Sequence, residues 1–538
     1  MRVIIIGGVA GGMSAATRLR RLDESASITV LERSGHVSFA NCGLPYYVGG
    51  VIEDRSSLLL QTPASLAARF RLDVRVNTEA VRIDRERQTV LTRDASGTET
   101  ELPYDRLVLS PGARPVRPPI PGIARTLSLR DVEDVDRIAA AANEAGTAVV
   151  IGGGFIGIEM AENLVHRGLE VSIIEAQPQV MAPLDPEMVA PVHRTLREAG
   201  VTLLLDDQVT AIGSDSVTTV AGTTLPADLV IAAFGVRPET SLAADAGLNL
   251  GPLGGIAVDD RHLTSDPHVY AVGDAAEKVA ALDGGPTLVP LANTANLAGR
   301  RVADDIAGLP VTNRPVLGTA IVGVFGLQVA TTGVNEKRLR QLGRPYRAIH
   351  THPASHAGYY PGAESMSLKV LVDPATDAIL GAQGVGRGGV DKRIDVLATA
   401  ITGGITASAL ADLELAYAPQ FGSAKDPINM LGYVADNLRT QTTMSIQWHE
   451  LASAMANGAV LVDVRSEGEH RAGAIPGSLL IPVDELRDRL DEIPEGPVVV
   501  HCAVGVRGHT AARILTQHGR SAVNLDGGYT TWAAATGA

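Results

Sequence analysis

The chain has 538 residues, enough for three or four domains, and its 46 basic and 60 acidic side chains give a net charge of −14. This acidic excess excludes a general nucleic-acid binder, although it leaves room for a local basic pocket that takes an anionic ligand. The two cysteines, Cys42 and Cys502, exclude a disulfide-stapled scaffold, a four-cysteine zinc site and a CxxC redox pair.

The first predicted elements form a βαβ unit. Residues 2–6 are expected to form a buried strand, 7–12 a tight glycine turn, 13–22 a helix, and 28–31 a second strand that ends at Glu32. An apolar start can mimic a short signal peptide, but a strand that runs into a glycine turn explains the same residues. Because no apolar run approaches the ~20 residues that span a bilayer, the sequence predicts a cytoplasmic protein.

Cys42 follows this unit in the segment Ser-Phe-Ala-Asn-Cys-Gly-Leu-Pro-Tyr-Tyr, at a predicted strand-to-helix transition. The N-terminus of a helix lowers the pKa of a thiol, and the thiolate is the reactive form. The alternative is an inert cysteine that fills the core. We expect a reactive cysteine whose pKa is lowered.

The βαβ plan returns about 145 residues later. Its strand, glycine turn, helix and second strand are expected at residues 148–151, 152–157, up to about 167, and 171–174. Segments 105–115 and 228–238 are also alike, since each is a strand that ends in a glycine turn and a proline. This internal duplication predicts two nucleotide-binding domains.

The second glycine turn is the clearer dinucleotide motif, because residues 152–157 match G-x-G-x-x-G and Glu175 ends the next strand. Such glycines let the backbone approach a pyrophosphate, while the acid accepts from ribose hydroxyls and repels a 2′-phosphate. This favours NAD over NADP. In the first turn Val9 takes the middle glycine position. The assignment of this turn to a dinucleotide therefore rests on the flanking strand and helix and on Glu32.

The strand within residues 264–274 delivers Gly273 and Asp274 to its end, where a carboxylate can accept from the ribitol of a flavin; the alternative is an ordinary turn aspartate. After about residue 313 the pattern changes to strands and turns, followed by a helical stretch over roughly 391–412. A proline-broken segment at 417–433, a polar helix end and linker at 434–446, and a separate α/β unit complete the chain.

Cys502 ends an apolar strand and precedes the loop 503–507 and a helix. Such a loop turns its N–H groups inward as a nest for an anion, here a thiolate or a persulfide, and Arg507 adds positive potential. Segments 463–465, 473–477, 501–507 and 525–532 together resemble a rhodanese domain. The C-x4-R spacing resembles sulfur transferases, whereas related phosphatases use C-x5-R. The alternative is an inactive module used for binding.

The order of these pieces over residues 1–440 resembles the flavoprotein disulfide reductases, in which the first nucleotide fold binds FAD and the second binds the nicotinamide nucleotide. The resemblance implies that Phe155 gates the flavin and that Asn296 contacts FAD. The predicted cofactor-binding residues are Gly7, Gly12, Glu32, Arg33, Gly112, Gly152, Gly154, Phe155, Gly157, Glu159, Glu175, Gly273, Asp274 and Asn296.

Disulfide reductases of this family carry a C-x4-C pair, but position 47 is Tyr, so Cys42 has no internal disulfide partner. The single-cysteine members are coenzyme A disulfide reductases, NADH oxidases and NADH peroxidases. Members that use oxygen or peroxide carry a His in the first glycine turn, where this chain has Ala10. The segment around Cys42 is most similar to the coenzyme A disulfide reductases.

That resemblance implies contacts to coenzyme A, with arginine and lysine suited to its phosphates. The implied contacts are Ser14, Arg18, Arg21, Ser38, Asn41 and Lys425. The alternative for the two arginines is that they lie on a solvated helix face. The family also has a basic residue that contacts the ligand near residue 70, but in this chain that position is Phe70. Tyr359, with Tyr360 as alternate, and Tyr417 resemble a catalytic pair that reaches the other subunit, which implies a homodimer; the alternative is aromatic packing at a dimer surface.

The predicted fold class is α/β, with two Rossmann-like dinucleotide-binding domains as in glutathione reductase, an α+β dimerisation domain and an α/β rhodanese domain. The expected boundaries are 1–115 and 241–312 for the FAD-binding domain, 116–240 for the NAD(H)-binding domain, 313–440 for the dimerisation domain and 447–538 for the rhodanese domain.

The implied function is an FAD-dependent NADH:coenzyme A persulfide, polysulfide or disulfide reductase, with NADPH left open. In it Cys42 is the redox cysteine and coenzyme A is ligand or substrate. Cys502 carries sulfane sulfur, which it delivers to the flavin site or accepts from a small donor. The alternatives are a coenzyme A disulfide reductase for thiol redox balance, an NADH oxidase, which Ala10 disfavours, and a non-enzymatic sulfur sensor.

Overall fold

The computed structural model describes residues 1–312 and 314–538, so the expected domain boundary at residue 313 lies outside the described residues. The chain forms two compact units. The first contains Met1–Val180 and Ala199–Gly318, and the second contains Met181–Glu198 and Thr319–Ala538. Within the described residues, none of the helices combines the length and the apolar character needed to cross a membrane.

The first unit is built on two parallel sheets. One has the strand order β17-β7-β1-β2-β3 and the other the order β11-β10-β9-β15. Their strands are β1 (Arg2–Ile6), β2 (Ser27–Leu31), β3 (Asp73–Arg75), β7 (Arg106–Leu109), β17 (Val269–Ala271), β9 (Thr147–Ile151), β10 (Glu170–Ile174), β11 (Thr202–Leu204) and β15 (Leu229–Ala232). Both predicted βαβ units are present, with strand bounds within one residue of those expected.

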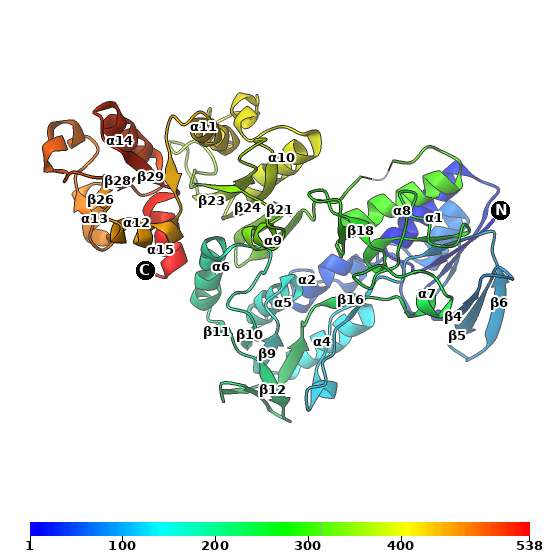
Figure 1. The fold of residues 1–538 in the computed structure, drawn as a ribbon. Coiled ribbons are helices and arrows are strands. Elements are labelled where there is room, and N and C mark those ends of the chain that lie inside the picture. The colour runs from blue at the N-terminus through cyan, green and yellow to red at the C-terminus, as the bar shows by residue number, and fades with distance from the viewer. Residues whose placement is uncertain (313) are drawn as a thin grey trace. The chain divides into compact units, whose positions relative to one another are not determined.

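Helix α1 (Ala10–Leu22) begins within the first glycine turn, three residues before its expected start, and packs on α8 (Ala292–Ile306), as Figure 1 shows. The two helices approach closely because both carry glycine at the contact: a Cβ on Gly299 would lie 2.1 Å from the carbonyl oxygen of Gly11. Their apolar faces share a core with the first sheet, including Leu19 and Val302.

The two like segments of the sequence meet in the fold. β8 (Ala113–Pro115) pairs antiparallel with β16 (Val236–Pro238). The other elements of this unit are α2 (Leu44–Val48), α3 (Pro63–Phe70), β4 (Thr78–Asp84), β5 (Thr89–Asp94), β6 (Glu99–Pro103), α4 (Val132–Glu144), α5 (Phe155–His166), β12 (Val209–Ile212), β13 (Ser216–Thr219), β14 (Thr224–Pro226), α7 (Ser241–Asp245), β18 (Lys278–Val279) and β19 (Pro286–Thr287).

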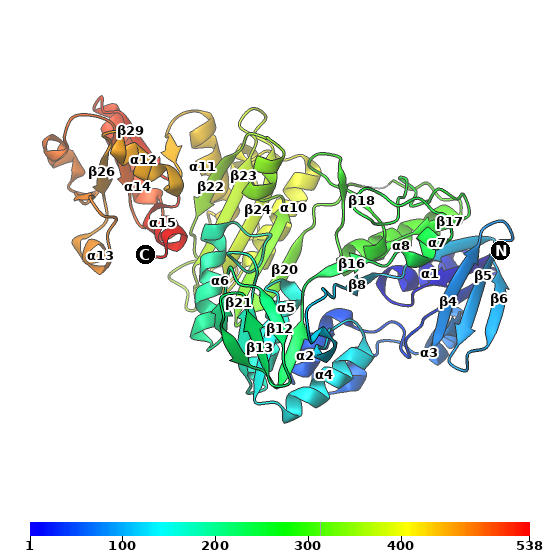
Figure 2. The same cartoon turned by 60° about the horizontal axis from the view of Figure 1, so that its bottom comes forward.

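The second unit contains an antiparallel sheet in the order β20-β21-β24-β23-β22. Its elements are α6 (Pro186–Glu198), β20 (Ala320–Val324), β21 (Leu327–Gly333), α9 (Glu336–Gln341), β22 (Arg347–Thr351), β23 (Met366–Val372), β24 (Ile379–Gly386), α10 (Val390–Gly403) and α11 (Pro427–Arg439). Helices α10 and α11 contact β21, β22 and β24, while α6 contacts β20 and β24 (Figure 2).

One predicted bound in this region is wrong. The helix expected over 391–412 ends at Gly403, because Gly404 takes a left-handed φ of 71° and closes the helix. The helix end expected in residues 434–446 is present, since α11 continues to Arg439. Asp426 and Asn429 start α11 with a reciprocal capping box that the proline-broken pattern conceals.

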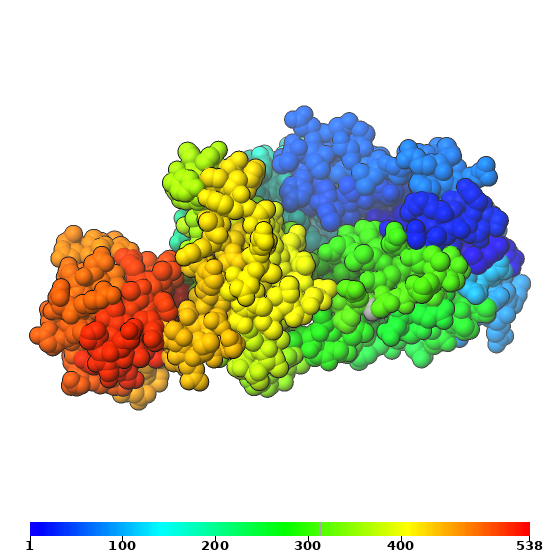
Figure 3. All heavy atoms as spheres, turned by 90° about the horizontal axis from the view of Figure 1, so that it is seen from above, coloured from blue at the N-terminus to red at the C-terminus, as the bar shows by residue number. Residues whose placement is uncertain are grey.

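The C-terminal part of the second unit is a parallel sheet in the order β25-β29-β28-β26-β27. Its elements are β25 (Ser445–Ile446), α12 (Leu451–Ala456), β26 (Val460–Asp463), α13 (Glu467–Ala472), β27 (Leu479–Leu480), β28 (Val498–His501), α14 (Val506–Gln517), β29 (Ala522–Leu525) and α15 (Gly528–Thr536). It packs beside the antiparallel part of the same unit (Figure 3) and touches α6 through α15. The predicted α/β fold class is confirmed.

Candidate functional site

The two glycine turns of the first unit have the same backbone geometry. Gly7 and Gly152 take φ values of 105° and 109°, and a Cβ on either would lie within 2.2 Å of a backbone carbonyl oxygen. A Cβ on Gly12 would come within 1.9 Å of the Gly7 carbonyl oxygen, as one on Gly157 would come within 2.0 Å of its counterpart. Side chains are therefore excluded at both ends of both turns. The backbone can thus approach a pyrophosphate closely, as dinucleotide binding requires.

The middle position explains why Val9 is tolerated. Gly154 has ordinary φ, and a Cβ there would meet nothing within 4 Å. The acids also match, since the amide of Gly8 donates to Glu32 at 2.9 Å and that of Gly153 donates to Glu175 at 2.7 Å. The first turn thus fits a dinucleotide despite its departure from the motif.

Asp274 lies in the turn after β17, where Gly273 takes a φ of 76°. Burial raises the pKa of this carboxyl group, while the charges of Lys278 and Arg130 oppose the rise. Asn296 on α8 lies against Ser14 on α1, with 2.6 Å between their side-chain oxygens. The close approach of α1 and α8 therefore joins a predicted flavin contact to a predicted coenzyme A contact.

The other predicted cofactor residues frame the same turns. Gly112 takes a φ of 74° between β7 and β8, Arg33 is exposed after Glu32, and half-buried Phe155 begins α5. Glu159, one turn further along α5, accepts a hydrogen bond from the hydroxyl of Tyr46 at 3.2 Å. Burial raises the pKa of Glu159.

Cys42 is exposed and lies in a single 3-10 turn, Asn41–Gly43, ahead of the five-residue helix α2. The expectation of a lowered pKa is wrong. Partial burial raises the pKa of the thiol, and the carboxylates of Glu159 and Asp274 raise it further. So short a helix contributes too small a dipole to offset two nearby negative charges.

Replacing Glu159 by Gln is therefore expected to make Cys42 more reactive at neutral pH, because one of the charges that oppose thiolate formation is removed. In a Cys502→Ser background Cys42 is the sole thiol. We expect alkylation at pH 7 to speed up about threefold and the pH profile to move to lower pH. The control is Glu170→Gln at an exposed position of β10; equal profiles for both variants would contradict the assignment.

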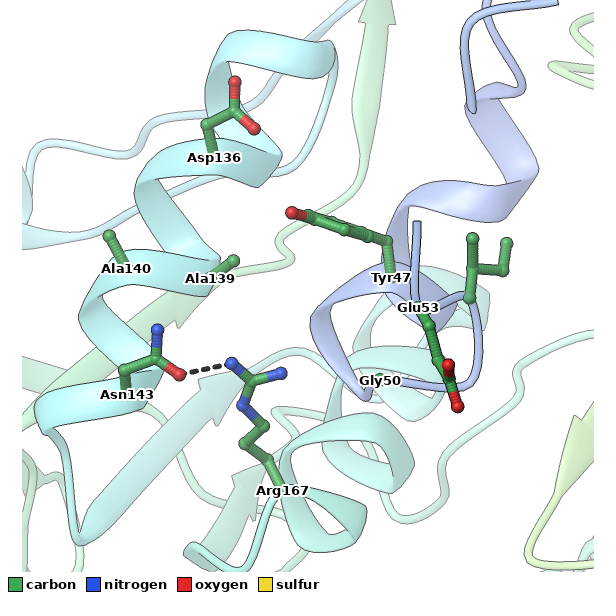
Figure 4. A pocket seen from close by; sticks show the side chains of 9 residues that line it. Tyr47, Gly50, Glu53, Asp136, Ala139, Ala140, Asn143 and Arg167 are labelled. Carbon is green, nitrogen blue, oxygen red and sulfur yellow. Dashed lines mark hydrogen bonds between the residues drawn. The ribbon is translucent and has the colours of Figure 1, made fainter. Parts of the chain in front are cut away.

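Tyr47, which stands where related reductases carry a second cysteine, lines a cavity of about 340 Å³ between α2 and α4 (Figure 4). The lining also includes Glu53, Asp136, Asn143 and Arg167. Because neither Cys42 nor a glycine turn lines it, this cavity is separate from the nucleotide cradles.

The predicted coenzyme A contacts on α1 already have partners. Arg18 forms an ion pair with Asp304 of α8, with 2.7 Å between Nε and Oδ1. The guanidinium of Arg21 lies 5.9 Å from the ring centroid of Phe70. Sequence analysis missed Asp304, which only the packing of α8 brings to α1. Ser38, with a left-handed φ of 51°, and exposed Asn41 flank Cys42 as expected.

In the second unit the predicted tyrosine pair is in contact. The hydroxyl oxygens of Tyr359 and Tyr417 lie 2.8 Å apart, on loops joined by the hydrogen bond from the Ala357 amide to the Gly422 carbonyl. Tyr360 instead packs edge-on against His356, so the geometry favours Tyr359 over its alternate. Lys425 follows on the second loop and is exposed.

Cys502 is buried at the end of β28. The amide of Gly505, which takes a φ of 97°, donates to its Sγ at 3.1 Å. Arg507, which is expected to add positive potential to this loop, donates two hydrogen bonds of 2.8 and 2.6 Å to Glu469 of α13. Glu469 was missed, although it completes the capping box that Ser466 begins.

Comparisons with known proteins agree with this architecture. Family models match residues 1–295 (pyridine nucleotide-disulphide oxidoreductase), 319–426 (the dimerisation domain of those enzymes) and 447–535 (rhodanese-like domain). The chain is 35% identical over 438 residues to a coenzyme A disulfide reductase of Staphylococcus aureus, covering 81% of this chain and 99% of that protein.

Two solved structures are similar over nearly the whole length. The reduced CoADR-RHD of Bacillus anthracis has 46% identity and a TM-score of 0.98, covering 100% of this chain and 98% of that one. A NAD-dependent persulfide reductase from A. fulgidus has 40% identity and a TM-score of 0.93, covering 99% and 100%. The chain therefore belongs to the pyridine nucleotide-disulphide oxidoreductase family.

Proposed function

We propose that the chain is a reductase of coenzyme A persulfides, polysulfides or disulfides that uses FAD and NADH and carries sulfane sulfur on its rhodanese domain. Family membership implies FAD and a nicotinamide nucleotide. The observation that carries the proposal is the placement of the only two thiols, one exposed beside a dinucleotide cradle and one buried in an anion-binding loop. Two relatives of similar architecture bear matching names.

The preference for NADH rests on Glu175. Its carboxylate holds the Gly153 amide and so stands at the edge of the second cradle. A negative charge there repels the 2′-phosphate of NADPH and accepts from the ribose hydroxyls of NADH.

The reactions balance as R–S–SH + NADH + H⁺ → R–SH + H₂S + NAD⁺ for a persulfide, and R–S–S–R + NADH + H⁺ → 2 R–SH + NAD⁺ for a disulfide. FAD, when bound, supplies the two-electron chemistry that links the nucleotide to sulfur. The Cys42 thiolate attacks the sulfane sulfur, the S–S bond breaks, and the coenzyme A thiolate leaves. Two electrons and two protons then return the Cys42 thiol and release H₂S.

The tyrosine pair supplies the proton for a leaving thiolate. Each hydroxyl lies within hydrogen-bond distance of the other, so one donates outward while the other supports it. Tyr359 is 76% exposed and Tyr417 48% exposed, as is expected of groups that act on another subunit.

A homodimer explains the exposed aromatic residues around this pair. Phe421, four residues after Tyr417, adds further exposed apolar area at 68% exposure, and Tyr433 of α11 is 39% exposed. The match to a dimerisation domain supports the same assembly.

Coenzyme A is the expected ligand because helix α1 of the first unit carries the arginines Arg18 and Arg21, a residue type that suits its phosphates. Arg21 lies against the ring of Phe70, and Arg18 shares its charge with Asp304. Lys425 in the second unit is exposed, and the family resemblance implies that it too contacts a coenzyme A phosphate.

Parallel assays test the proposal. NADH consumption is measured with coenzyme A persulfide, coenzyme A disulfide, polysulfide and oxygen, in the unaltered protein and in Cys502→Ser. We expect sulfur substrates to exceed oxygen by at least about tenfold, and Cys502→Ser to lose activity with polysulfide while keeping it with the disulfide. Oxygen turnover equal to persulfide turnover would instead identify an NADH oxidase, and an unaffected Cys502→Ser would remove the rhodanese domain from the reaction.

A further inference from the structure

The antiparallel sheet of the second unit has a face that is polar and yet buried. Leu368 and Val370 pack with α10 and α11, so Lys369 between them points to the opposite face. His350 and Gln383 are its cross-strand neighbours on β22 and β24, and they are 3% and 1% exposed. Helix α6 and the C-terminal helix α15 lie on this side, so the polar face joins the sheet to the rhodanese-like domain.

His350 has a carboxylate at each ring nitrogen. Its Nδ1 lies 2.6 Å from Asp526 and its Nε2 lies 3.0 Å from Glu187 of α6. Its backbone amide also donates to Asp526 at 3.1 Å. Burial alone lowers the pKa of an imidazole, but the two carboxylates outweigh it and raise the pKa to about 9. His350 is therefore protonated on both ring nitrogens, and it donates through Nδ1 to Asp526 and through Nε2 to Glu187.

Asp526 begins the turn that supports the Cys502 loop. The next two residues, Gly527 and Gly528, take left-handed φ values of 66° and 61°. A Cβ on Gly527 would lie 2.9 Å from the Cβ of His350, and a Cβ on Gly528 would lie 2.5 Å from the carbonyl oxygen of Cys502. The turn thus fills the space between strand β22 and the Cys502 backbone, and no side chain fits within it.

Hydrogen bonds fix the same turn on both sides. The amides of Tyr529 and Thr530 donate to the carbonyl oxygens of Cys502 and Ala503 at 2.8 and 2.9 Å. On the other side the Nε2 of His352 lies 2.8 Å from the Oγ1 of Thr531. A displacement of the turn after Asp526 therefore also shifts the Cys502 loop, in which the Gly505 amide donates to the Sγ of Cys502.

We propose that His350 is a positioning residue for Cys502: it holds Asp526, and the turn after Asp526 holds the backbone of the sulfur-carrying loop. The inference rests on the proposed function, in which Cys502 carries persulfide. An imidazolium suits this position because its two donors point in opposite directions and bridge Asp526 to Glu187. A glutamine side chain donates from one end only, so it satisfies one carboxylate at a time.

The test uses a Cys42→Ser background, in which Cys502 is the sole thiol. Alkylation by iodoacetamide is followed at pH 7 and pH 10 with and without His350→Gln. We expect the rate to rise about tenfold at both pH values, because Cys502 is buried in the native loop and displacement of the turn opens that loop to the reagent. The matched control is His449→Gln, an exposed histidine of the same domain.

Equal rates at pH 7 for the His350 and His449 variants would overturn the proposal. A slower reaction in His350→Gln than in the His449 control would also overturn it, because the turn then does not hold the buried Cys502 loop closed. Should His350→Gln fail to fold, Gln447→Ala decides, since it removes another donor to Asp526, at 3.1 Å, and leaves the His350–Glu187 pair intact. Alkylation needs no sulfur substrate, so this result is independent of the substrate assays that test the proposed function.

Discussion

Replacing Cys42 by serine is expected to lower NADH-dependent reduction of coenzyme A persulfide and disulfide by at least about 10³-fold, the scale of loss when a catalytic nucleophile is removed. A serine hydroxyl does not form the mixed disulfide or persulfide through which sulfur is reduced. The effect is confined to chemistry because Cys42 lies in the Asn41–Gly43 turn and contributes no atom to either glycine cradle.

The variant should retain a normal flavin content and should still load sulfane sulfur on Cys502. Both are measured directly, by the visible spectrum of the purified protein and by the mass of the persulfide adduct. Cys502→Ser is the matched control, because it removes the other thiol and should leave disulfide reduction intact. Substantial persulfide reduction by Cys42→Ser would show that electrons reach sulfur without this thiol and would refute the mechanism.

The glycine turns were predictable because their requirements are local. A left-handed φ at Gly7 and Gly152 and the exclusion of a Cβ at Gly12 and Gly157 follow from a strand that turns directly into a helix. The same holds for the Cys502 loop, where strand, loop and helix follow one another within a dozen residues. Family, fold class and the general function are accordingly confirmed, while the individual site residues stay predictions.

The pKa of Cys42 was not predictable, because the groups that set it come from elsewhere. Glu159 belongs to the second nucleotide fold and Asp274 to the return of the chain to the first. The sequence near Cys42 shows only a short helix after the cysteine, which predicts a lowered pKa instead of a raised one. Which charges face a thiol is decided by packing between segments that are distant in sequence.

The buried polar face was missed for a related reason. The alternation Ser-Leu-Lys-Val-Leu around Lys369 is typical of a strand with one solvated face. That face is instead covered by α6, which precedes the sheet by more than a hundred residues in the chain, and by α15 at its end. The sequence around Lys369 cannot show that this face of the sheet is buried, because the helices that cover it are distant in the chain.

Lys369 provides the second large expected effect. Its ammonium group is fully buried and lies 2.8 Å from Asp185 and 2.6 Å from Glu336, with Glu187 as a third carboxylate in contact. Burial tends to lower the pKa of Lys369, but the attraction of the three carboxylates outweighs burial and raises it. The three acids by themselves have the arrangement of a cation site, and the lysine occupies it.

Lys369→Met keeps the volume and removes the charge, which leaves three buried carboxylates facing one another. Breaking a buried ion cluster by deleting one partner costs about 3–5 kcal/mol, so the second unit is expected to unfold roughly 10 °C lower in a calorimetric scan at pH 7. Lys337→Met, at an exposed position beside Glu336 on α9, is the control and should change the transition by less than about 2 °C.

The sign of the pH dependence distinguishes charge from packing. Burial tends to raise the pKa of Glu187 and Glu336, but the contacts with Lys369, and with His350 for Glu187, outweigh it and lower both. Groups with a lowered folded-state pKa contribute stability above their unfolded pKa of about 4.3 and lose it as the pH falls. In Lys369→Met the same acids are destabilising while ionised, so the gap between variant and unaltered protein should be largest at neutral pH and should narrow below about pH 5. A gap that is constant with pH would mean that the methionine merely packs badly, and the electrostatic account of this face would then be wrong.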